Sequence, residues 1–406
     1  MSEPVKDWTT DYDIFDPAYV QDPFLVWDTM RGECPVAHSE RHGGSWMPTR
    51  YEDLFALARD VEHFSSREIL VAPRPIRPDA NDPNYGVRAP PISSDPPEHT
   101  WSRKLLLPWF TQKTTAQYED ETRALCNSLI DKFIAEGRAD AAEDYAQQIP
   151  PRVIAFMLGV SPDLADTFVG WVRATLEQGF LNPEAAVIPR GQLINFFREQ
   201  VADRQANPRE NDLITYLLTE KVDGEPIPLL HVLGTCLLLL VAGIDTTWSS
   251  IGSALWHLAQ NPQDRARLIA EPEMMTNAVE ELLRAYSPVT MARIVASDVE
   301  YKGCPMHEGD RLIMNFPAAN RDPEKFENPD EVILDRQNNP HIAFGVGIHR
   351  CAGSNLARME MRISLETWLK RIPDFQLENA EAVTWAGGQV RGPRQLPVLF
   401  PAGGSR

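Results

Sequence analysis

The sequence predicts a mostly α-helical protein with a small β-rich region, and three observations support this fold class. Apolar residues recur at helical spacing, for example over 125–134, which is typical of helices with one buried face. Proline follows a polar residue at 161–162 and at 261–262, a common way for a helix to begin. Stretches with strand character are few and short. Helices should therefore form most of the core.

Taken in chain order, the N-terminal part combines both kinds of element. Residues 46–51 have strand character and residues 52–59 helical character, so a small mixed α/β patch is expected over 30–65. Residues 70–97 contain eight prolines, a density that neither a helix nor a sheet tolerates. We expect a long irregular loop there, which is either a surface excursion or a lid over a pocket.

Helical patterning dominates from about residue 98 onwards. An apolar stripe marks the helix that starts at 161–162, and short strands are expected at 293–301, 311–315 and 396–400. There is no internal repeat and no low-complexity linker. The pattern is that of a large helical core with a minor sheet component.

The composition argues against several classes of protein. The chain has 58 acidic and 39 basic side chains, and the resulting net charge of −19 disfavours nucleic-acid binding. Five cysteines without repeated spacing indicate a reducing compartment. The N-terminal thirty residues lack an apolar run, and the most apolar stretch, 237–244, is shorter than the roughly 20 residues that span a bilayer. We therefore expect no membrane segment.

An apolar helix is expected around 237–254, and three unfavourable residues stand in its middle. Gly243 costs about 1 kcal/mol relative to alanine in a helix. Asp245 is costly to bury unless it is paired, and the Thr246 hydroxyl can bond back to the carbonyl four residues earlier. This combination suggests a functional kink, where small residues admit a ligand and the Asp–Thr pair relays protons. The alternative is a packing glycine beside an aspartate at a helix end.

Two further pairs of residues share a helix face. Glu281 and Arg284 are three apart, and by themselves they indicate no more than a surface ion pair. His99 and Arg103 are four apart, where a helix follows the proline-rich loop. Two cationic or hydrogen-bonding groups on one face suit a carboxylate ligand.

The loop Phe344–Gly353 carries the strongest signal. Its glycines at 345 and 347 permit a tight turn, and a helical stretch follows at once. The first amides of that helix would face Cys351 and stabilise a thiolate. On these residues alone, Cys351 is a thiolate ligand, a buried structural cysteine, or a catalytic cysteine with His349 as its partner.

The pattern Phe344-Gly-x-Gly-x-His-x-Cys-x-Gly353 resembles the haem-binding signature of the cytochrome P450 superfamily. Residues 242–247 resemble the oxygen-activating helix of that family, and Glu281 and Arg284 its core-locking pair. The segment 326–336 resembles the one that supplies a third partner, here Arg336. The likeness extends from about residue 22 to residue 400. It implies one mostly helical domain over residues 1–406, in which the proline-rich loop roofs the substrate pocket.

The resemblance also implies roles for individual residues. Cys351 would be the axial ligand to the iron of haem b (iron protoporphyrin IX), and Phe344 would pack beneath the ring. Asp245 and Thr246 would be the catalytic pair that delivers protons to bound oxygen. The other implied positions are the propionate partners His99, Arg103, Arg293 and His349, the cofactor contacts Ala242, Gly243, Gly345 and Gly353, and the pocket residues Leu239, Ala242 and Val289.

The activity implied is that of a cytoplasmic, monomeric monooxygenase, which activates O2 with two electrons and hydroxylates a small hydrophobic molecule such as a terpenoid or an aromatic compound. No flavin- or iron–sulfur-binding pattern is present. Electrons are therefore expected from a ferredoxin and its NAD(P)H-dependent reductase. The ferredoxin would dock on a basic patch beneath Cys351, made of Arg103, Lys104, Lys113, Arg350, Arg358 and Arg362.

Two alternatives to this activity remain open. A peroxide-driven peroxygenase of the same fold typically carries an Arg-Pro pair where this chain has Asp245-Thr246. A non-catalytic haem-thiolate sensor would need no proton relay. The substrate pocket itself is expected to be an apolar chamber that includes Phe168, Trp171, Phe180 and Leu181.

Overall fold

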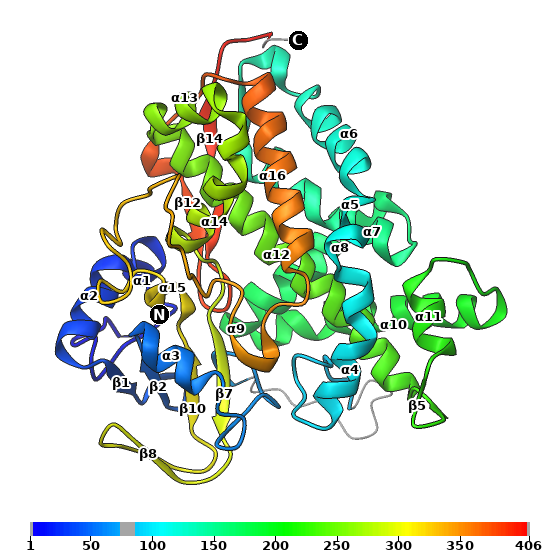
Figure 1. Cartoon of the computed structure of the whole chain (residues 1–406), viewed down its shortest axis with the longest axis vertical. Coiled ribbons are helices and arrows are strands. Elements are labelled where there is room, and N and C mark those ends of the chain that lie inside the picture. Colours follow the sequence, from blue (N-terminus) through cyan, green and yellow to red (C-terminus); the bar gives the residue numbers. More distant parts are fainter. Residues whose placement is uncertain (1–2, 74–85, 404–406) are drawn as a thin grey trace.

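The computed structural model describes residues 3–73 and 86–403, apart from the side chains of Leu181 and Pro183. Helices make up most of it, and the largest sheet lies toward the corner formed by the N-terminal segment (Figure 1). This confirms the predicted fold class. Within the proline-rich loop expected over 70–97, the described residues 86–97 contain no helix or strand, and 74–85 lie outside the described residues.

The α-helices of the described chain differ widely in length, and the two longest are α12 and α10. They are α1 (Pro17–Gln21), α2 (Phe24–Glu33), α3 (Tyr51–Leu57), α4 (Glu98–Leu106), α5 (Gln112–Ala116), α6 (Glu119–Ile130), α7 (Ile149–Leu158), α8 (Ala165–Arg173), α9 (Gly179–Leu181), α10 (Pro183–Ala206), α11 (Leu213–Thr219), α12 (Leu229–Gln260), α13 (Pro262–Ala270), α14 (Met275–Ala285), α15 (Phe316–Ala319) and α16 (Ser354–Arg371). Three short turns also bear on the site: η2 (Leu107–Phe110), the π-helical η7 (Ala174–Gln178) and η9 (Gly347–His349).

The largest sheet has five strands in the order β1-β2-β10-β7-β3. Strands β2 and β10 run parallel, and the other neighbours run antiparallel. These strands are β1 (Val36–Ser39), β2 (Ser45–Pro48), β3 (Phe64–Ser65), β7 (Met291–Val295) and β10 (Arg311–Met314). The smaller sheets contain β4 (Arg138–Asp140), β5 (Lys221–Val222), β6 (Glu225–Pro226), β8 (Val299–Tyr301), β9 (Cys304–Met306), β11 (Gln376–Leu377), β12 (Thr384–Ala386), β13 (Gly392–Gln395) and β14 (Pro397–Leu399).

Of the helix starts predicted at 161–162 and 261–262, only the first has the expected side-chain cap, and one predicted strand is divided. Ser161 caps the turn that opens the next helix by accepting a hydrogen bond from the Asp163 amide. Asn261 does not cap α13, because its side chain donates back to the His257 carbonyl instead. The stretch expected as one strand at 293–301 forms two, β7 and β8, which belong to different sheets.

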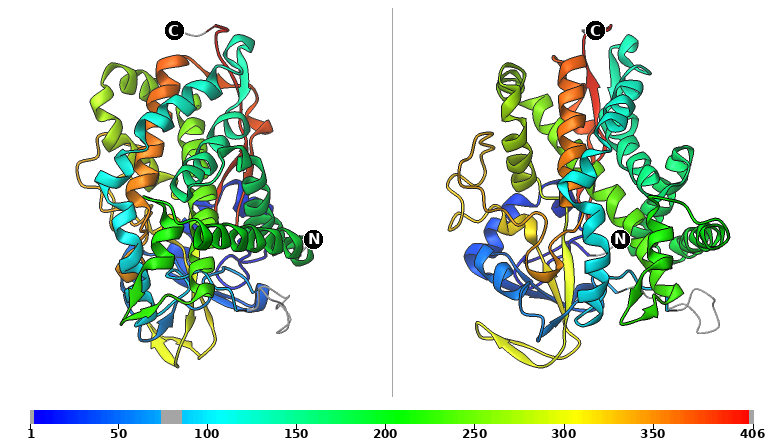
Figure 2. Two further views of the ribbon diagram at one scale, coloured as in Figure 1. Left: turned by 90° about the vertical axis from the view of Figure 1, so that its right-hand side faces the viewer. Right: turned by 45° about the vertical axis from the view of Figure 1, so that its right-hand side comes forward.

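Helix α12 runs through the middle of the molecule (Figures 1 and 2) and packs against α7, α10, α16 and β13. By length and mean hydropathy (1.9 over 18 residues) it could cross a membrane, although the sequence suggested only a short apolar stretch there. However, 61% of that window is buried inside the protein. The apolar character of α12 is therefore accounted for by the core that surrounds it.

Candidate active site

The loop that carries Cys351 is held in a tight turn. Gly345 and Gly347 have positive φ angles of 69° and 77°, a conformation that favours glycine, as the sequence predicted. The Cys351 amide donates to the Phe344 carbonyl at 2.7 Å and so closes the loop. Helix α16 begins three residues later at Ser354. The Cys351 side chain is thereby placed at the wall of a cavity, to which it is exposed.

Opposing effects act on the Cys351 thiol. Desolvation raises its pKa above the usual range, whereas a hydrogen bond from the Gly353 amide and the nearby Arg103 and Arg350 lower it. The expectation from sequence included only the amide contribution, because the desolvation caused by distant segments is not visible in a local motif. The donors that would support a thiolate are nevertheless in place.

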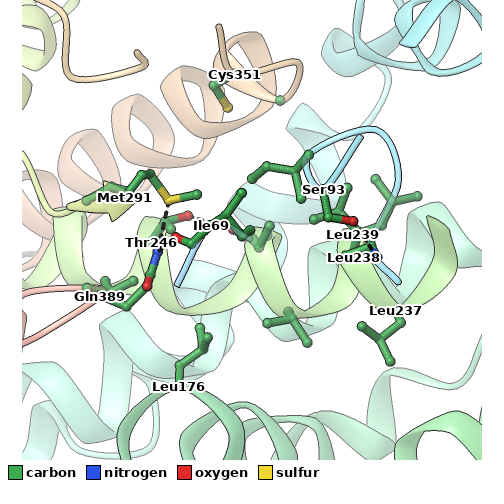
Figure 3. Close-up of a pocket in the computed structure, with 18 of the residues that line it drawn as sticks. Ile69, Ser93, Leu176, Leu237, Leu238, Leu239, Thr246, Met291, Cys351 and Gln389 are labelled. Atoms are coloured by element: carbon green, nitrogen blue, oxygen red, sulfur yellow. Dashed lines mark hydrogen bonds between the residues drawn. The ribbon is translucent and has the colours of Figure 1, made fainter. Parts of the chain in front are cut away.

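A cavity of about 860 Å³ separates the cysteine loop from α12. In Figure 3, Cys351 stands at the start of α16 on one side, and Thr246 lies on α12 on the other. Among the described lining residues, the aromatic ones are Phe110, Phe316 and Phe344. All three belong to the cysteine side, since the first two flank Gly353 and Gly345 and the third is in the loop itself.

The middle of α12 shows the predicted hydrogen bond and a partner that was not predicted. The Thr246 hydroxyl donates to the Ala242 carbonyl at 2.8 Å, one turn earlier. Asp245 is buried, and its Oδ1 accepts from Arg394 Nη2 at 2.7 Å and from the Ser249 hydroxyl at 3.4 Å. Burial raises the pKa of Asp245 to about 6 although Arg394 opposes this rise.

Gly243 has a packing role that the sequence did not indicate. A Cβ at this position would lie 2.6 Å from Ile154 Cδ1 on α7, too close for any real side chain. The glycine therefore lets α7 pack against α12, and this packing explains it without a ligand. Gly243 also borders the cavity, as does Ala242.

A group of cationic and imidazole side chains meets at one edge of the cavity. His99 lies on α4 and His349 on η9, and their ring centroids are 4.3 Å apart. Each has a buried Nε2 without a hydrogen-bond partner among the described residues. Arg293 on β7 is 5% exposed, and its Nη1 donates to the Ala292 carbonyl. Arg103 donates to the Arg350 carbonyl.

Burial acts on this group in a consistent direction. It lowers the pKa of Arg293 to about 10, a shift that the charge of Asp95 only partly opposes. It also lowers the pKa of His99, with Arg103 contributing in the same direction. Buried cations, and imidazoles that each have a buried Nε2 without a partner among the described residues, call for a bound anion. Two carboxylates, such as the propionates of haem, would meet that need.

The residues present therefore fit haem. Cys351 lines one side of the cavity, and aromatic rings lie beside the cysteine loop. The cationic and imidazole side chains lie at one edge of the cavity. The axial ligand would come from Cys351, and the propionates would lie beside His99, Arg293 and His349. The fit to haem is judged from the thiol, cationic and imidazole groups that are present, and from the two buried Nε2 atoms that have no partner among the described residues.

The expected core-locking triad is formed. Arg284 donates to both carboxylate oxygens of Glu281, at 2.8 and 2.9 Å, and both residues are fully buried. Arg336 Nε donates to the same carboxylate at 3.0 and 3.1 Å. Isolated spacing had indicated only a surface pair, so the burial corrects that interpretation. The triad connects α14 to the segment that leads into the cysteine loop.

The residues that line the substrate side of the cavity agree only in part with those predicted from the sequence. Leu239, Ala242 and Val289 line it as expected. Phe168, Trp171 and Phe180 are not among its described lining residues, and the side chain of Leu181 lies outside the described part. Phe168 is fully buried in the main core, which a helical stripe cannot distinguish from a cavity wall. Lining residues that were not predicted from the sequence include Ile69, Leu176, Met291 and Gln389, which are labelled in Figure 3.

The basic patch expected beneath Cys351 is partly neutralised. Arg358 donates to Glu280 at 2.6 and 2.7 Å, and Arg362 pairs with Glu119 at 2.8 Å. Both guanidinium groups therefore face acids of the same chain. The exposed members of the patch are Lys104, Lys113 and Arg350.

The fold and the site together fit an enzyme that binds haem through a cysteine, and comparison with known proteins agrees. The family model described as Cytochrome P450 matches residues 184–381. The chain is 36% identical over 86% of its length to a probable cytochrome P450 127A1 of Sinorhizobium fredii, of which 82% is covered. It is 32% identical over 93% of its length to the polyketide biosynthesis cytochrome P450 PksS of Bacillus subtilis, covering 95% of that protein. The chain therefore belongs to the cytochrome P450 family, and its cofactor is haem.

Solved structures support the same assignment. Cytochrome P450 CYP109Q5 from Chondromyces apiculatus superposes with a TM-score of 0.87 at 29% identity, covering 98% of this chain and all of that one. PksS of Bacillus subtilis superposes with a TM-score of 0.86 at 30% identity, covering 96% and 99% of the two chains. The protein is thus an oxidoreductase of the bacterial cytochrome P450 type, the class that uses redox partners and hydrophobic substrates.

The cationic group at the cavity edge gives a first testable prediction. Arg293→Leu should release haem about tenfold to a hundredfold faster, because hydrogen bonds to charged groups contribute about 1.5–3 kcal/mol. Transfer of haem to apomyoglobin would measure this rate. Arg293→Lys is the matched control, since it keeps the charge and should lose less. Equal rates for wild type and Arg293→Leu would show that Arg293 does not bind the cofactor.

Proposed function

We propose that this protein is an O2-dependent monooxygenase that hydroxylates a largely saturated hydrophobic molecule. The observation that carries the proposal is Thr246, which lines the cavity across from Cys351 and follows the buried acid Asp245 on α12. An acid and an alcohol at this position can hold and pass protons, which oxygen cleavage requires and simple ligand binding does not.

The protein's own residues would divide the work as follows. Haem, when bound, would supply the oxygen and electron chemistry, and the Cys351 thiolate would hold it. Thr246 faces the cavity and can hold a proton at its hydroxyl. Asp245, the preceding residue, is buried and is not among the described residues that line the cavity; burial raises its pKa to about 6, which would let it exchange protons near neutral pH. The apolar walls keep bulk water away from the reacting carbon.

The lining of the cavity supports a saturated substrate over an aromatic one. Away from the cysteine side, many of the described wall residues are aliphatic or small, and no aromatic ring stands among them to stack on a flat substrate. Charged and polar side chains also line the cavity, among them Arg67, Glu68, Arg88, Arg190 and Gln389. The Gln389 amide is already engaged with the Ile69 carbonyl, the Val71 amide and the Met291 sulfur. Relatives named as steroid C26-monooxygenase and as a mycinamicin IV hydroxylase/epoxidase are consistent with large aliphatic substrates.

A matched pair of ligands tests this preference. Decalin and naphthalene share one fused carbon skeleton, which is saturated in the first and aromatic in the second. Titration of the ferric protein should give a low- to high-spin Soret shift with a lower dissociation constant for decalin. Tighter binding of naphthalene would contradict the proposed substrate class while leaving the monooxygenase assignment intact.

The electrons would come from a ferredoxin and its NAD(P)H-dependent reductase. The exposed Lys104, Lys113 and Arg350 offer a small basic surface close to the cysteine loop for an acidic ferredoxin. Because these cations are exposed to solvent, their contribution should weaken with salt. A cytoplasmic, monomeric, single-domain enzyme completes the proposal, supported by the acidic composition and the free cysteines of the described chain.

Replacing Thr246 separates this proposal from its two alternatives. Thr246→Ala should lower product formation at least about tenfold, since a positioned proton donor typically contributes about 10²–10⁴-fold. The consumed oxygen should appear as hydrogen peroxide, measured against NAD(P)H oxidation. Thr247→Ala, one residue on, is the matched control and should keep the coupling.

Two results would favour the alternatives instead. A peroxygenase would turn over with hydrogen peroxide alone and remain inactive with any ferredoxin system. A haem-thiolate sensor would bind its ligand equally well with or without the Thr246 hydroxyl and would form no product.

A further inference from the structure

A buried chain of charges connects the acid of α12 to the outer surface. Arg394 on β13 donates from Nη2 to Asp245 Oδ1 at 2.7 Å and from Nε to Glu177 Oε1 at 2.6 Å. Its Nη1 donates to the Ser249 hydroxyl at 3.0 Å. One guanidinium is thus shared between two carboxylates that lie 68 residues apart, on α12 and on η7.

The strand that carries Arg394 is fixed against α12. A Cβ on Gly392 would lie 2.3 Å from Ser249 Cβ, so the strand can approach this closely only with glycine there. Trp248 Nε1 donates to the Pro393 carbonyl at 3.4 Å, and the Arg394 guanidinium lies 4.3 Å from the centre of the Trp248 ring. Arg394 therefore has little freedom to leave the acid.

The two ends of the chain differ in their access to water. The Asp245 side chain is 1% exposed, and its second oxygen, Oδ2, has no hydrogen-bond partner among the described residues. The Glu177 side chain is 17% exposed and also pairs with the more exposed Arg173 at 3.4 Å. A guanidinium does not release its protons near neutral pH. Arg394 therefore cannot relay a proton, but its hydrogen bond to one oxygen of Asp245 can determine which oxygen carries the proton.

We propose that Arg394 is a positioning residue that holds Oδ1 of Asp245 and leaves Oδ2 to carry the proton, and that Glu177 tunes this hold by competing for the same guanidinium. The proposal rests on the proposed function, in which Asp245 supplies protons. Nothing in the local sequence around Asp245 indicates either partner, because Arg394 is 149 residues away.

The charges that face Asp245 predict shifts of its pKa in opposite directions for two variants. Burial and Glu177 raise the pKa of Asp245, while Arg394 and the Ser249 hydroxyl lower it. Arg394→Gln removes the cation and should raise this pKa by about one to three units. Glu177→Gln removes the competing anion and should lower it. A residue that acted only through general stability would not produce shifts of opposite sign.

Infrared spectroscopy of the reduced, carbon-monoxide-bound holoenzyme can follow the protonated Asp245 carboxyl through a pH titration. The band is assigned by its loss in Asp245→Asn. Arg391→Gln is the matched control, because Arg391 is a nearby arginine that donates to the Val20 and Gln21 carbonyls and to neither acid. The expected result is an upward shift for Arg394→Gln, a downward shift for Glu177→Gln and no shift for the control. Shifts of the same sign, or none, would overturn the proposal.

Measurements of activity separate a failure of the positioning role of Arg394 from a failure of the proposed proton role of Asp245. If Asp245→Asn leaves coupling of oxygen to product unchanged, the proposed proton role of Asp245 is wrong, whatever the titrations show. If Asp245→Asn uncouples the enzyme but Arg394→Gln and Glu177→Gln leave the titration of Asp245 unmoved, only the positioning role of Arg394 fails. Arg394→Lys adds a further check, since restoring the cation should bring the titration back toward wild type.

Discussion

Cys351→Ser is expected to abolish monooxygenation and to remove the strongly red-shifted Soret band of the reduced, carbon-monoxide-bound protein. That band depends on a thiolate donor to the iron. A serine hydroxyl keeps its proton at neutral pH, so the donors that the loop directs at this position, the Gly353 amide and the nearby arginines, would have no anion to stabilise. Product formation should fall to the background level of the assay, and the difference spectrum should lack the band.

Cys304→Ser is the matched control for this experiment. Cys304 is a partly exposed free cysteine on β9, which belongs to a hairpin apart from the cavity lining. This variant should keep both the spectrum and the activity. A persistent red-shifted band in Cys351→Ser, or its loss in Cys304→Ser, would show that the axial ligand is a different residue.

The parts of the site that could be predicted from sequence are those built from contiguous residues. The cysteine loop is one such part, because its positive φ angles and its closing hydrogen bond involve residues only a few positions apart. The Thr246 hydrogen bond to Ala242 is another, since helix geometry alone sets it. The Glu281–Arg284 pair was found in the same way, although its burial depends on tertiary packing and followed only from the family resemblance, not from the spacing.

What could not be predicted depends on contacts between distant segments. Arg394 reaches Asp245 across 149 positions, and no periodicity marks a strand of four residues that packs on a helix. The aromatic stripe of α8 illustrates the complementary error, because Phe168 faces the core while Leu176, on the π-helical turn that follows, faces the cavity. Helical spacing shows which residues share a face, but not whether that face meets the core or a cavity.

Loss of the Glu281 carboxylate is expected to destabilise the fold strongly. Glu281→Gln should lower the free energy of unfolding by about 3–5 kcal/mol, since it leaves two arginines buried beside a neutral amide. Burial raises the pKa of Glu281, but hydrogen bonds from Arg284 and the Ile333 amide outweigh it and bring the pKa below its usual value. The stabilisation is therefore complete above the unfolded pKa, near 4.5, and is lost as the pH falls through the lower folded value.

Denaturant unfolding of the holoenzyme at pH 7 and at progressively lower pH would measure both consequences. The wild type should lose stability on acidification more steeply than Glu281→Gln, whose amide cannot titrate. Glu273→Gln, an exposed change in the turn before α14, serves as the control and should unfold like the wild type. Because Arg336 ties this carboxylate to the segment preceding the cysteine loop, Glu281→Gln should also retain less haem. Wild-type stability in Glu281→Gln would mean that packing around α14, rather than the triad, holds the loop in place.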